Sequence, residues 1–448
     1  MVRPMKRVRS VAEQWLWLGV TAIAIAGIYA LVPVIGRTPQ FKDLPIAQKL
    51  FDVALVVHVD MSVLIWSVAM VCMGGALLIE RHAARWPYWG KVGFWCTAIA
   101  TLFMALSPLD EWIVVKSNYI PVLHNGMFMF SLGLLFAGVV VSLIPVFVTY
   151  AQTRYLRTLE VPELAFVAAI ITVFIGLIGY AYGAQVLPAG LPLVEHYELL
   201  FWLGGHIMQF AFTLVAMAAW LMLLRALGGA MPSRGMALVI YAIAVAGAFI
   251  SYVTFAFATQ SVTERKYEQT RIMIEWAGIA PTLLTILIVA SLLRLRMTRA
   301  TRAYGSALIV SFILFYFGGA LGLMISGQNV TIPAHYHGMI VGITQGLMGL
   351  AYVMLPRFGY ESVAGKRLAF WQPIVYGVGQ LMHIGGLAYC GGYGILRKTA
   401  GGFEHLAPDI KVALGIFGVG GLLAISGGIL FVIVMIRAER GTSASLQP

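Results

Sequence analysis

Two histidines, His335 and His337, stand two residues apart in the segment IPAHYHGMIVGITQG, just inside an apolar stretch. On an α-helix, residues i and i+2 point about 200° apart, because each residue turns the helix by about 100°. The two imidazole rings would therefore leave opposite sides of one helix and could not easily bind a single ion. They could instead hold two separate groups, one on each side of the helix.

The composition of the chain sets the environment of these histidines. Of its 448 residues, 60% are hydrophobic and only 11% are charged, whereas soluble proteins carry roughly 25% charged residues. The formal net charge of +12 could suggest a nucleic-acid partner, but the basic residues stand in short loops between apolar runs. That distribution is typical of membrane topology. We therefore expect an integral membrane protein that contacts lipid and not nucleic acid.

Apolar runs long enough to cross a bilayer recur along the whole chain, since a spanning helix needs about 20 apolar residues. The sequence contains twelve such runs: 14–36, 51–80, 88–107, 120–150, 162–185, 196–228, 236–258, 273–294, 306–326, 333–355, 371–395 and 409–437. The second, fourth and sixth exceed the minimum length and are expected to tilt or to project from the bilayer. We expect a single all-α membrane domain over residues 1–448, a bundle of twelve transmembrane helices.

The basic residues also predict the orientation of this bundle. They are concentrated in the N-terminal tail, in alternate loops and after the last span, for example at Arg81, Arg154, Arg299 and Arg437. The side richer in Lys and Arg is normally cytoplasmic, and an even number of spans places both termini on one side. Both termini are therefore expected in the cytoplasm.

Four histidines share one depth once the spans are oriented. They are His58 in the second span, His206 in the sixth, and His335 and His337 near the start of the tenth. All three spans enter from the outer side, so the four imidazoles lie in the outer half of the membrane. One membrane histidine can simply bond a neighbouring helix, but four at one depth favour a functional site. Nearby glycines would let a flat, bulky group approach, although glycines also serve helix packing: Gly204, Gly205, Gly338, Gly342 and Gly346.

A porphyrin satisfies these constraints. Heme iron takes axial imidazole; two imidazoles give a low-spin, electron-carrying centre, and one leaves a position open for a ligand. His58 and His337 could clamp one heme between the second and tenth spans. His335, on the opposite side of the tenth span, could then hold a second heme, with one helix between the two.

With these features the chain resembles the heme-copper oxidase superfamily, the catalytic subunits of terminal oxidases and bacterial nitric oxide reductases. Twelve helices, a histidine on the second, LFWLGGH on the sixth and AHYHG on the tenth match its plan over nearly the whole chain. The resemblance implies His58 and His337 as ligands of a low-spin heme b, and His335 as the ligand of a high-spin b-type heme. The segment GYGILRKTAGG is similar to the family's basic pair, so Arg397 and Lys398 would contact heme propionates from the outer side.

The family's second metal site, which holds copper or non-heme iron, is incomplete here. It needs His206 and an adjacent histidine pair late in the seventh span, where this sequence reads GAFISYVTFAFATQSV. One imidazole does not satisfy a copper ion that normally takes three nitrogen ligands. Phe210 stands where many oxidases carry a cross-linked tyrosine and nitric oxide reductases a glutamate. We therefore expect no copper and no efficient reduction of oxygen to water, with His206 and the phenylalanines of the seventh span facing the open side of the second heme.

Three further polar residues stand in or beside these spans. Asp60 could orient a heme ligand or face solvent, and both readings stay open. Glu198 is expected to be solvated at the outer end of the sixth span. His383 is expected to hydrogen-bond a neighbouring helix, because no ligand of the family stands at its place.

Electrons must come from a partner, because the sequence has no CxxCH motif for covalent heme and no iron–sulfur motif. We expect a subunit or soluble cytochrome with heme c or copper on the outer face, or a quinol. Three functions stay open. The first is a catalytic oxidoreductase subunit of a respiratory-type electron-transfer complex in a bacterial-type inner membrane, reducing oxygen or nitric oxide. The second is a copper-less electron-transfer subunit with no gas-reducing activity of its own. The third, a transporter, is disfavoured by the clustered histidines.

Overall fold

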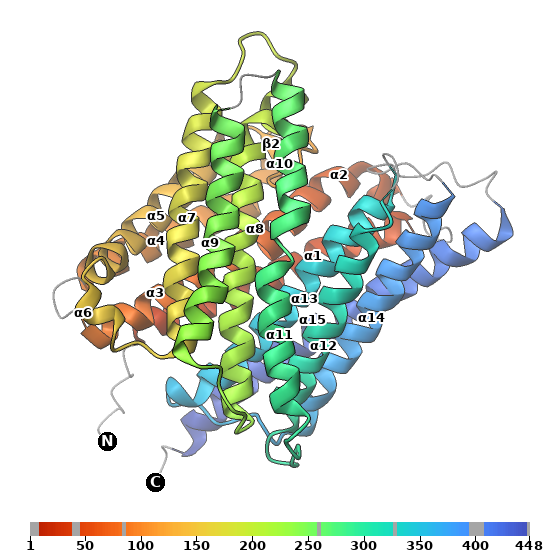
Figure 1. The fold of residues 1–448 in the computed structure, drawn as a ribbon. Helices are drawn as coiled ribbons and strands as arrows, with labels where there is room; N and C mark the ends of the chain where they lie inside the picture. Colours follow the sequence, from red (N-terminus) through yellow and green to blue (C-terminus); the bar gives the residue numbers. More distant parts are fainter. Residues whose placement is uncertain are drawn as a thin grey trace, which may run out of the picture.

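The computed structural model describes residues 9–37, 45–82, 87–257, 261–325, 329–393 and 407–445. These residues form a bundle of long helices packed side by side, with one small β-hairpin (Figure 1). Eleven of the described helices are long and apolar enough to cross a bilayer. The prediction of an all-α, multi-pass membrane protein is therefore confirmed.

The described helices follow one another in a simple order. They are α1 (Val11–Arg37), α2 (Pro45–Val59), α3 (Trp66–His82), α4 (Pro87–Leu106), α5 (Gly126–Tyr150), α6 (Thr153–Leu156), α7 (Val161–Gln185), α8 (Leu193–Ala226), α9 (Arg234–Phe257), α10 (Val262–Trp276), α11 (Ile279–Leu292), α12 (Arg302–Gly322), α13 (Thr331–Arg357), α14 (Arg367–Gly392) and α15 (Pro408–Ser445). The predicted span 371–395 forms α14, which is not one of the eleven apolar helices. It carries Gln372, Gln380 and His383, and its crossing of the bilayer stays a prediction.

Two predicted spans are interrupted by non-α backbone on the histidine side of the bundle. A π-helix, η1 (Asp60–Ile65), joins α2 to α3 directly after His58. Such an insertion widens the helical turn and is frequent at functional sites. The predicted span 120–150 begins too early: Val122–His124 is strand β2, antiparallel to β1 (Ile113–Val115). α5 starts after Asn125, whose side chain caps it by accepting a hydrogen bond from the backbone N–H of Phe128.

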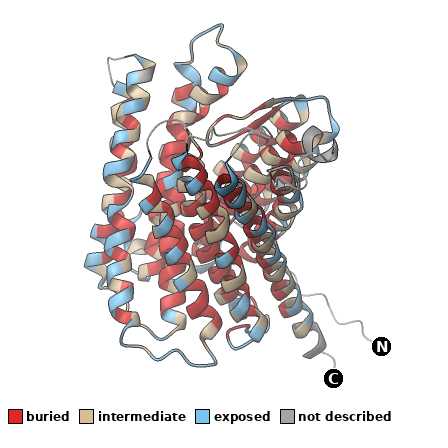
Figure 2. Cartoon of the chain, turned by 90° about the vertical axis from the view of Figure 1, so that its right-hand side faces the viewer, coloured by how far each residue is buried: buried red, intermediate tan, exposed pale blue. Residues whose placement is uncertain are grey.

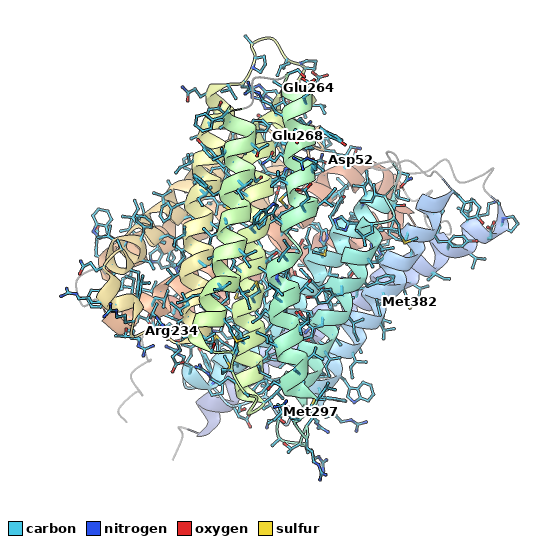
Figure 3. All side chains as sticks on the ribbon, in the orientation of Figure 1. Asp52, Arg234, Glu264, Glu268, Met297 and Met382 are labelled. Carbon is cyan, nitrogen blue, oxygen red and sulfur yellow. The ribbon has the colours of Figure 1, made fainter. Side chains whose placement is uncertain are left out.

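The predicted span 273–294 is also two helices rather than one. α10 ends at Trp276 and α11 begins at Ile279, so the α-helix is interrupted at Ala277 and Gly278 within one long candidate span. Pro281 follows in the first turn of α11, where its missing N–H costs nothing. α10 carries charged residues and lies at the upper end of the bundle, where Glu264 and Glu268 are labelled (Figure 3).

α8 and α13 form the centre of the bundle. In each, 83% of the most apolar window is buried within the protein, more than in any other described span. Figure 2 shows buried residues gathered in the middle of the bundle and exposed ones along its outer helices. They are joined through Trp220 of α8, whose indole N–H donates to the hydroxyl of Ser311 on α12 at 2.8 Å; that hydroxyl donates in turn to the Gly342 carbonyl of α13 at 2.7 Å. The helices with His206, His335 and His337 are thus the most enclosed.

The two ends of the chain lie on the same face of the bundle (Figure 1). Arg9, just before α1, forms an ion pair with Glu439 near the end of α15. Tyr360, which follows α13, donates a hydrogen bond to Glu13 on the same face. These contacts agree with an even number of crossings. The assignment of this face to the cytoplasm stays a prediction.

Candidate functional site

The two histidines of α13 point toward different neighbouring helices. The Nδ1–H group of His335 donates to the carbonyl oxygen of Gly318 on α12 at 2.8 Å. The ring of His337 lies against α14, where its Nε2–H group donates to Oε1 of Gln380 at 2.9 Å. The expectation that the two imidazoles leave α13 on different sides is therefore confirmed.

His335 is held in a geometry that suits a metal ligand. Because its Nδ1 proton is given to a backbone carbonyl, the ring is in the tautomer that leaves a lone pair on Nε2. Gly322 of α12 makes room for the ring, since a Cβ atom there would lie 2.6 Å from Nδ1. Metal-binding histidines usually donate their other ring N–H to a carbonyl or carboxylate in this way.

His58 is oriented by the same type of contact. Its Nδ1–H group donates to the carbonyl oxygen of Ala26 on α1 at 3.0 Å, which again leaves the lone pair on Nε2. Asp60, two residues later in η1, is 0% exposed, and neither of its carboxylate oxygens has a hydrogen-bond partner among the described residues. The solvent-facing reading of Asp60 is therefore wrong.

The surroundings of His337 differ from those of His58 and His335. Its ring centroid lies 5.1 Å from that of His383 on α14. Because its Nε2 is bonded to Gln380, an iron ion would have to bind Nδ1, or Nε2 after that bond breaks. His383 itself donates from Nδ1 to the Phe417 carbonyl of α15 at 3.1 Å and stacks on the Phe417 ring at 4.0 Å. The prediction of a packing hydrogen bond for His383 is confirmed.

His206 of α8 is buried, with 5% of its surface exposed, and both of its ring nitrogens are engaged. Its Nδ1–H group donates to the carbonyl oxygen of Trp202 at 3.0 Å. The hydroxyl of Tyr119 lies 2.7 Å from each ring nitrogen. Because the Nδ1 proton is donated to a carbonyl, Nε2 is the ring nitrogen that can accept a hydrogen bond from the phenol. Tyr119 is a site residue that the sequence reasoning missed.

Tyr119 contacts His206 from the loop between β1 and β2, and hydrogen bonds to Glu198 hold this loop in place. Tyr119 has a φ of 65°, the one positive value among the described non-glycine residues. The Glu198 carboxylate accepts from the backbone N–H of Asn118 at 2.8 Å and from its side-chain amide at 2.5 Å. Lys266 of α10 lies 3.8 Å from Glu198 and 3.9 Å from the Trp202 ring centroid. Glu198 is therefore partly exposed and also holds this loop, a role that the sequence did not predict.

The glycines of α8 admit aromatic side chains of this chain. A Cβ atom on Gly205 would lie 2.2 Å from Cγ of Tyr119, and one on Gly204 would lie 2.3 Å from Cδ1 of Tyr180. On α13, a Cβ atom on Gly338 would meet the backbone of Gly318 at 2.5 Å. At these positions the helix-packing reading of the glycines is correct.

The end of α9 lacks metal ligands in its described part. Phe255 is buried against Phe210, Leu203 and Ile207, but Phe257 is 75% exposed and does not line the site as predicted. Throughout the described residues, no group of three or more His, Cys, Asp or Glu side chains could hold a metal ion. The predicted propionate contacts, Arg397 and Lys398, lie outside the described residues, so their role stays a prediction.

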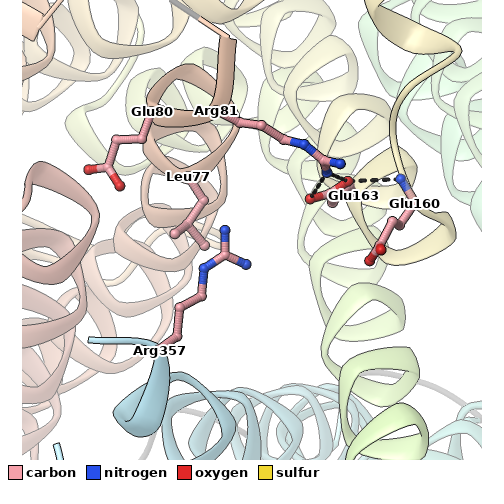
Figure 4. A pocket seen from close by; sticks show the side chains of 6 residues that line it. All are labelled: Leu77, Glu80, Arg81, Glu160, Glu163 and Arg357. Atoms are coloured by element: carbon pink, nitrogen blue, oxygen red, sulfur yellow. Dashed lines mark hydrogen bonds and ion pairs between the residues drawn. The ribbon is translucent and has the colours of Figure 1, made fainter. Parts of the chain in front are cut away.

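A cavity of about 430 Å³ lies where the spans that begin near His58 and His335 end. Figure 4 shows its lining side chains. Its lining consists of Leu77, Glu80, Arg81, Glu160, Glu163 and Arg357. Arg81 and Glu163 form an ion pair at 2.5 Å, and Glu160 pairs with Arg225. Because the spans that carry Arg81 and Arg357 end there, this charged cavity opens on the face where both ends of the chain lie.

Comparison with characterised folds agrees with this architecture. A heme-copper terminal oxidase, determined as a dimer by cryo-electron microscopy, superposes with a TM-score of 0.74 and 15% sequence identity, covering 98% of this chain and 84% of that one. An uncharacterized protein of Rickettsia prowazekii (strain Madrid E) is 27% identical in an alignment of 497 positions that covers 95% of each chain. An uncharacterized protein of Aquifex aeolicus (strain VF5) is 29% identical over 356 residues, 79% of this chain and 86% of that one.

The family model for cytochrome c and quinol oxidase polypeptide I matches residues 10–436. This range includes each of the four histidines and all of the spans except the last residues of the final one. The resemblance inferred from LFWLGGH and AHYHG is thereby confirmed. The chain belongs to the cytochrome c and quinol oxidase polypeptide I family, the heme-copper oxidase superfamily of membrane proteins.

Proposed function

We propose that this protein is a membrane-embedded, b-type diheme oxidoreductase subunit of a respiratory-type electron-transfer complex. One observation carries the proposal: His58 and His335 each give the Nδ1 proton to a backbone carbonyl of a neighbouring helix, at 3.0 and 2.8 Å. Both rings therefore present a neutral Nε2 lone pair, which is the atom that an axial ligand of heme iron needs. These two donors thus fit heme, whereas His337 would bind iron through Nδ1 or after its Nε2 bond to Gln380 breaks.

The residues of this chain would have the following roles in binding the two hemes. His58 and His337 would hold the low-spin heme b, and His335 the high-spin one; Arg397 and Lys398 would bind propionates. When bound, heme supplies one-electron transfer and, where an axial position is open, binding of a small ligand. The backbone carbonyls of Ala26 and Gly318 would fix the orientation of the ligand rings. α13 would separate the two hemes by a single helix, a short path for an electron.

We further propose that the second metal of the family is absent. The lone pair of His206 Nε2 accepts the Tyr119 hydroxyl hydrogen, and its Nδ1 is protonated. A metal ion would have to displace that hydrogen bond and would find no second imidazole in the described part of α9. Copper prefers several nitrogen ligands, so the site disfavours it.

The alternative function is a copper-less electron-transfer subunit with no gas-reducing activity of its own. It would follow if both hemes had two axial ligands from the protein. The bond between His206 and Tyr119 opposes this alternative, because it keeps His206 Nε2 away from iron. We therefore favour a subunit whose second heme is open on one side.

The electron donor would approach the outer face, because all four histidines lie in the first half of their spans, the half that the predicted orientation places outside. A subunit or soluble cytochrome with heme c or copper, or a quinol, would serve. The location would be a bacterial-type inner membrane.

The decisive experiment is an optical spectrum of the purified protein combined with iron and copper analysis. We expect reduced b-type bands, two hemes per chain and no copper above background. Absence of heme would refute the proposal, and stoichiometric copper would refute the absent second metal.

Matched variants locate the hemes. His335→Ala should lose the high-spin component and His58→Ala the low-spin one, since each leaves the iron without a required ligand. His124→Ala is the control: this exposed histidine bonds Tyr197 at 2.7 Å outside the proposed heme sites. If His124→Ala changed the spectrum as strongly as the other two variants, the assignment of ligands would be wrong.

A further inference from the structure

We infer that the charged cavity between the ends of α3, α7 and α13 binds the headgroup of a zwitterionic phospholipid that carries a primary amine. Arg357 would hold the phosphate of this headgroup and Glu80 its ammonium group. Neither residue belongs to the proposed heme sites, so lipid binding at this cavity does not depend on the proposed function.

The position of the cavity matches the headgroup layer of a bilayer. Arg81 and Arg357 are the last residues of two candidate spans, and Glu160 precedes the first residue of a third, α7. Polar headgroups begin where such apolar spans end. Leu77, one helical turn before Arg81, gives the cavity an apolar wall. The volume of about 430 Å³ lies within the range of ligand pockets, roughly 300–1,000 Å³.

Four of the charges at this cavity neutralise one another. Arg81 pairs with Glu163, and Arg225 pairs with Glu160. Glu163 also accepts a hydrogen bond from the backbone N–H of Glu160 at 2.8 Å, which completes the capping box of α7. Because its own side chains satisfy the start of α7, this helix end does not need an external anion.

Two opposite charges, on Glu80 and Arg357, are left over. Within the described residues, the Arg357 guanidinium forms no hydrogen bond or ion pair, and the Glu80 carboxylate accepts one hydrogen bond, from the backbone N–H of Ala12 at 3.2 Å. Both residues line the cavity, and Figure 4 shows the Arg357 side chain pointing toward Leu77. A ligand with one negative and one positive group therefore complements the cavity better than a simple anion does.

Phosphatidylethanolamine carries this pair of groups in its headgroup. A guanidinium suits a phosphate, because its planar N–H groups match the phosphate oxygens. A primary ammonium group has three N–H donors for a carboxylate. Phosphatidylcholine has the same charges but no N–H on its ammonium, and phosphatidylglycerol has no positive charge. These two lipids therefore separate the contribution of the amine hydrogens from that of the charge.

The test is native mass spectrometry of the full-length protein, delipidated in detergent and mixed with equal amounts of the three lipids with identical acyl chains. We expect the adduct with phosphatidylethanolamine to exceed each of the other two several-fold. Equal binding of phosphatidylglycerol would show a site for anions and overturn the inference. Equal binding of all three lipids would show unselective contact and overturn it as well.

A matched pair of variants locates the site. Arg357→Gln should lower binding of phosphatidylethanolamine by roughly three- to tenfold, the effect of one partly exposed, charge-assisted hydrogen bond. Arg299→Gln is the control, because Arg299 is also an exposed arginine but lies in the loop between α11 and α12, outside the cavity lining. Equal binding by the two variants would contradict the assignment to Arg357.

A second measurement needs no variant and distinguishes a lipid from a soluble phosphodiester. Phosphatidylethanolamine should raise the unfolding temperature of the wild-type protein more than phosphatidylglycerol does at the same mole ratio, because a ligand of the folded state stabilises it. Glycerophosphoethanolamine shares the headgroup but has no acyl chains, so it should have little effect at the same concentration. If it stabilised the protein as strongly as the lipid, the ligand would be a soluble phosphodiester and the inferred lipid would be wrong.

Discussion

Replacement of Gly205 by alanine should separate Tyr119 from His206 and destabilise the protein. The added Cβ would lie 2.2 Å from Cγ and 2.6 Å from Cβ of Tyr119. These atoms are at the base of the side chain, so rotation of the ring does not relieve the clash. The backbone of Tyr119 would have to move, and the hydrogen bonds from Asn118 to Glu198 oppose that movement.

The expected change in the free energy of unfolding is the sum of three effects. Overpacking of a buried site costs about 1–3 kcal/mol, and the lost hydrogen bond between Tyr119 and His206 costs about 0.6 kcal/mol at the average measured inside membranes. Alanine in place of glycine within a helix returns about 0.5–1 kcal/mol. The net expectation is that Gly205→Ala lowers the free energy of unfolding by about 0.6–3 kcal/mol.

The assay is thermal unfolding in detergent, read by tryptophan fluorescence, with the heme spectrum recorded on the same samples. Gly133→Ala on α5 is the control, because a Cβ atom there meets nothing within 4 Å; it should be neutral or stabilising. Gly205→Ala should unfold at a lower temperature than both wild type and Gly133→Ala. If the two variants unfolded alike, at or above the wild-type temperature, Tyr119 would not be seated on α8 and the reasoning would be refuted.

Three other outcomes are expected. His337→Ala should abolish the low-spin bis-imidazole signal as completely as His58→Ala, because either change leaves that iron one ligand short; electron paramagnetic resonance checks this, and a normal low-spin signal in both variants would exclude the assignment. Trp220→Phe should lower the free energy of unfolding by about 1–3 kcal/mol, since it leaves a cavity and removes the bond to Ser311, as thermal unfolding would show; an unchanged transition would argue against that contact. Cysteine tags placed at the two termini should both be shielded from an impermeant reagent in intact cells, and labelling of either one would contradict the predicted orientation.

Much of the architecture is determined by the sequence on its own. Helix spans can be placed because a bilayer demands long, nearly continuous apolar runs, and such runs are visible without any knowledge of neighbours. The divergence of His335 and His337 was also predictable, because helical periodicity alone separates residues two apart. The four histidines could also be grouped by depth, because the order and direction of the spans determine depth before any packing is known.

The tertiary structure decided what those histidines touch. Tyr119 and His206 are 87 positions apart, and Asn118 and Glu198 are 80 apart. No periodic pattern reports such contacts, because a loop has no repeating direction and its course depends on what holds its ends. The same limit applies to Gln380, which stands 43 positions from His337 on another helix. Apolar patterning determines which segments enter the membrane, whereas side-chain fit between helices and loops determines which polar groups meet inside it.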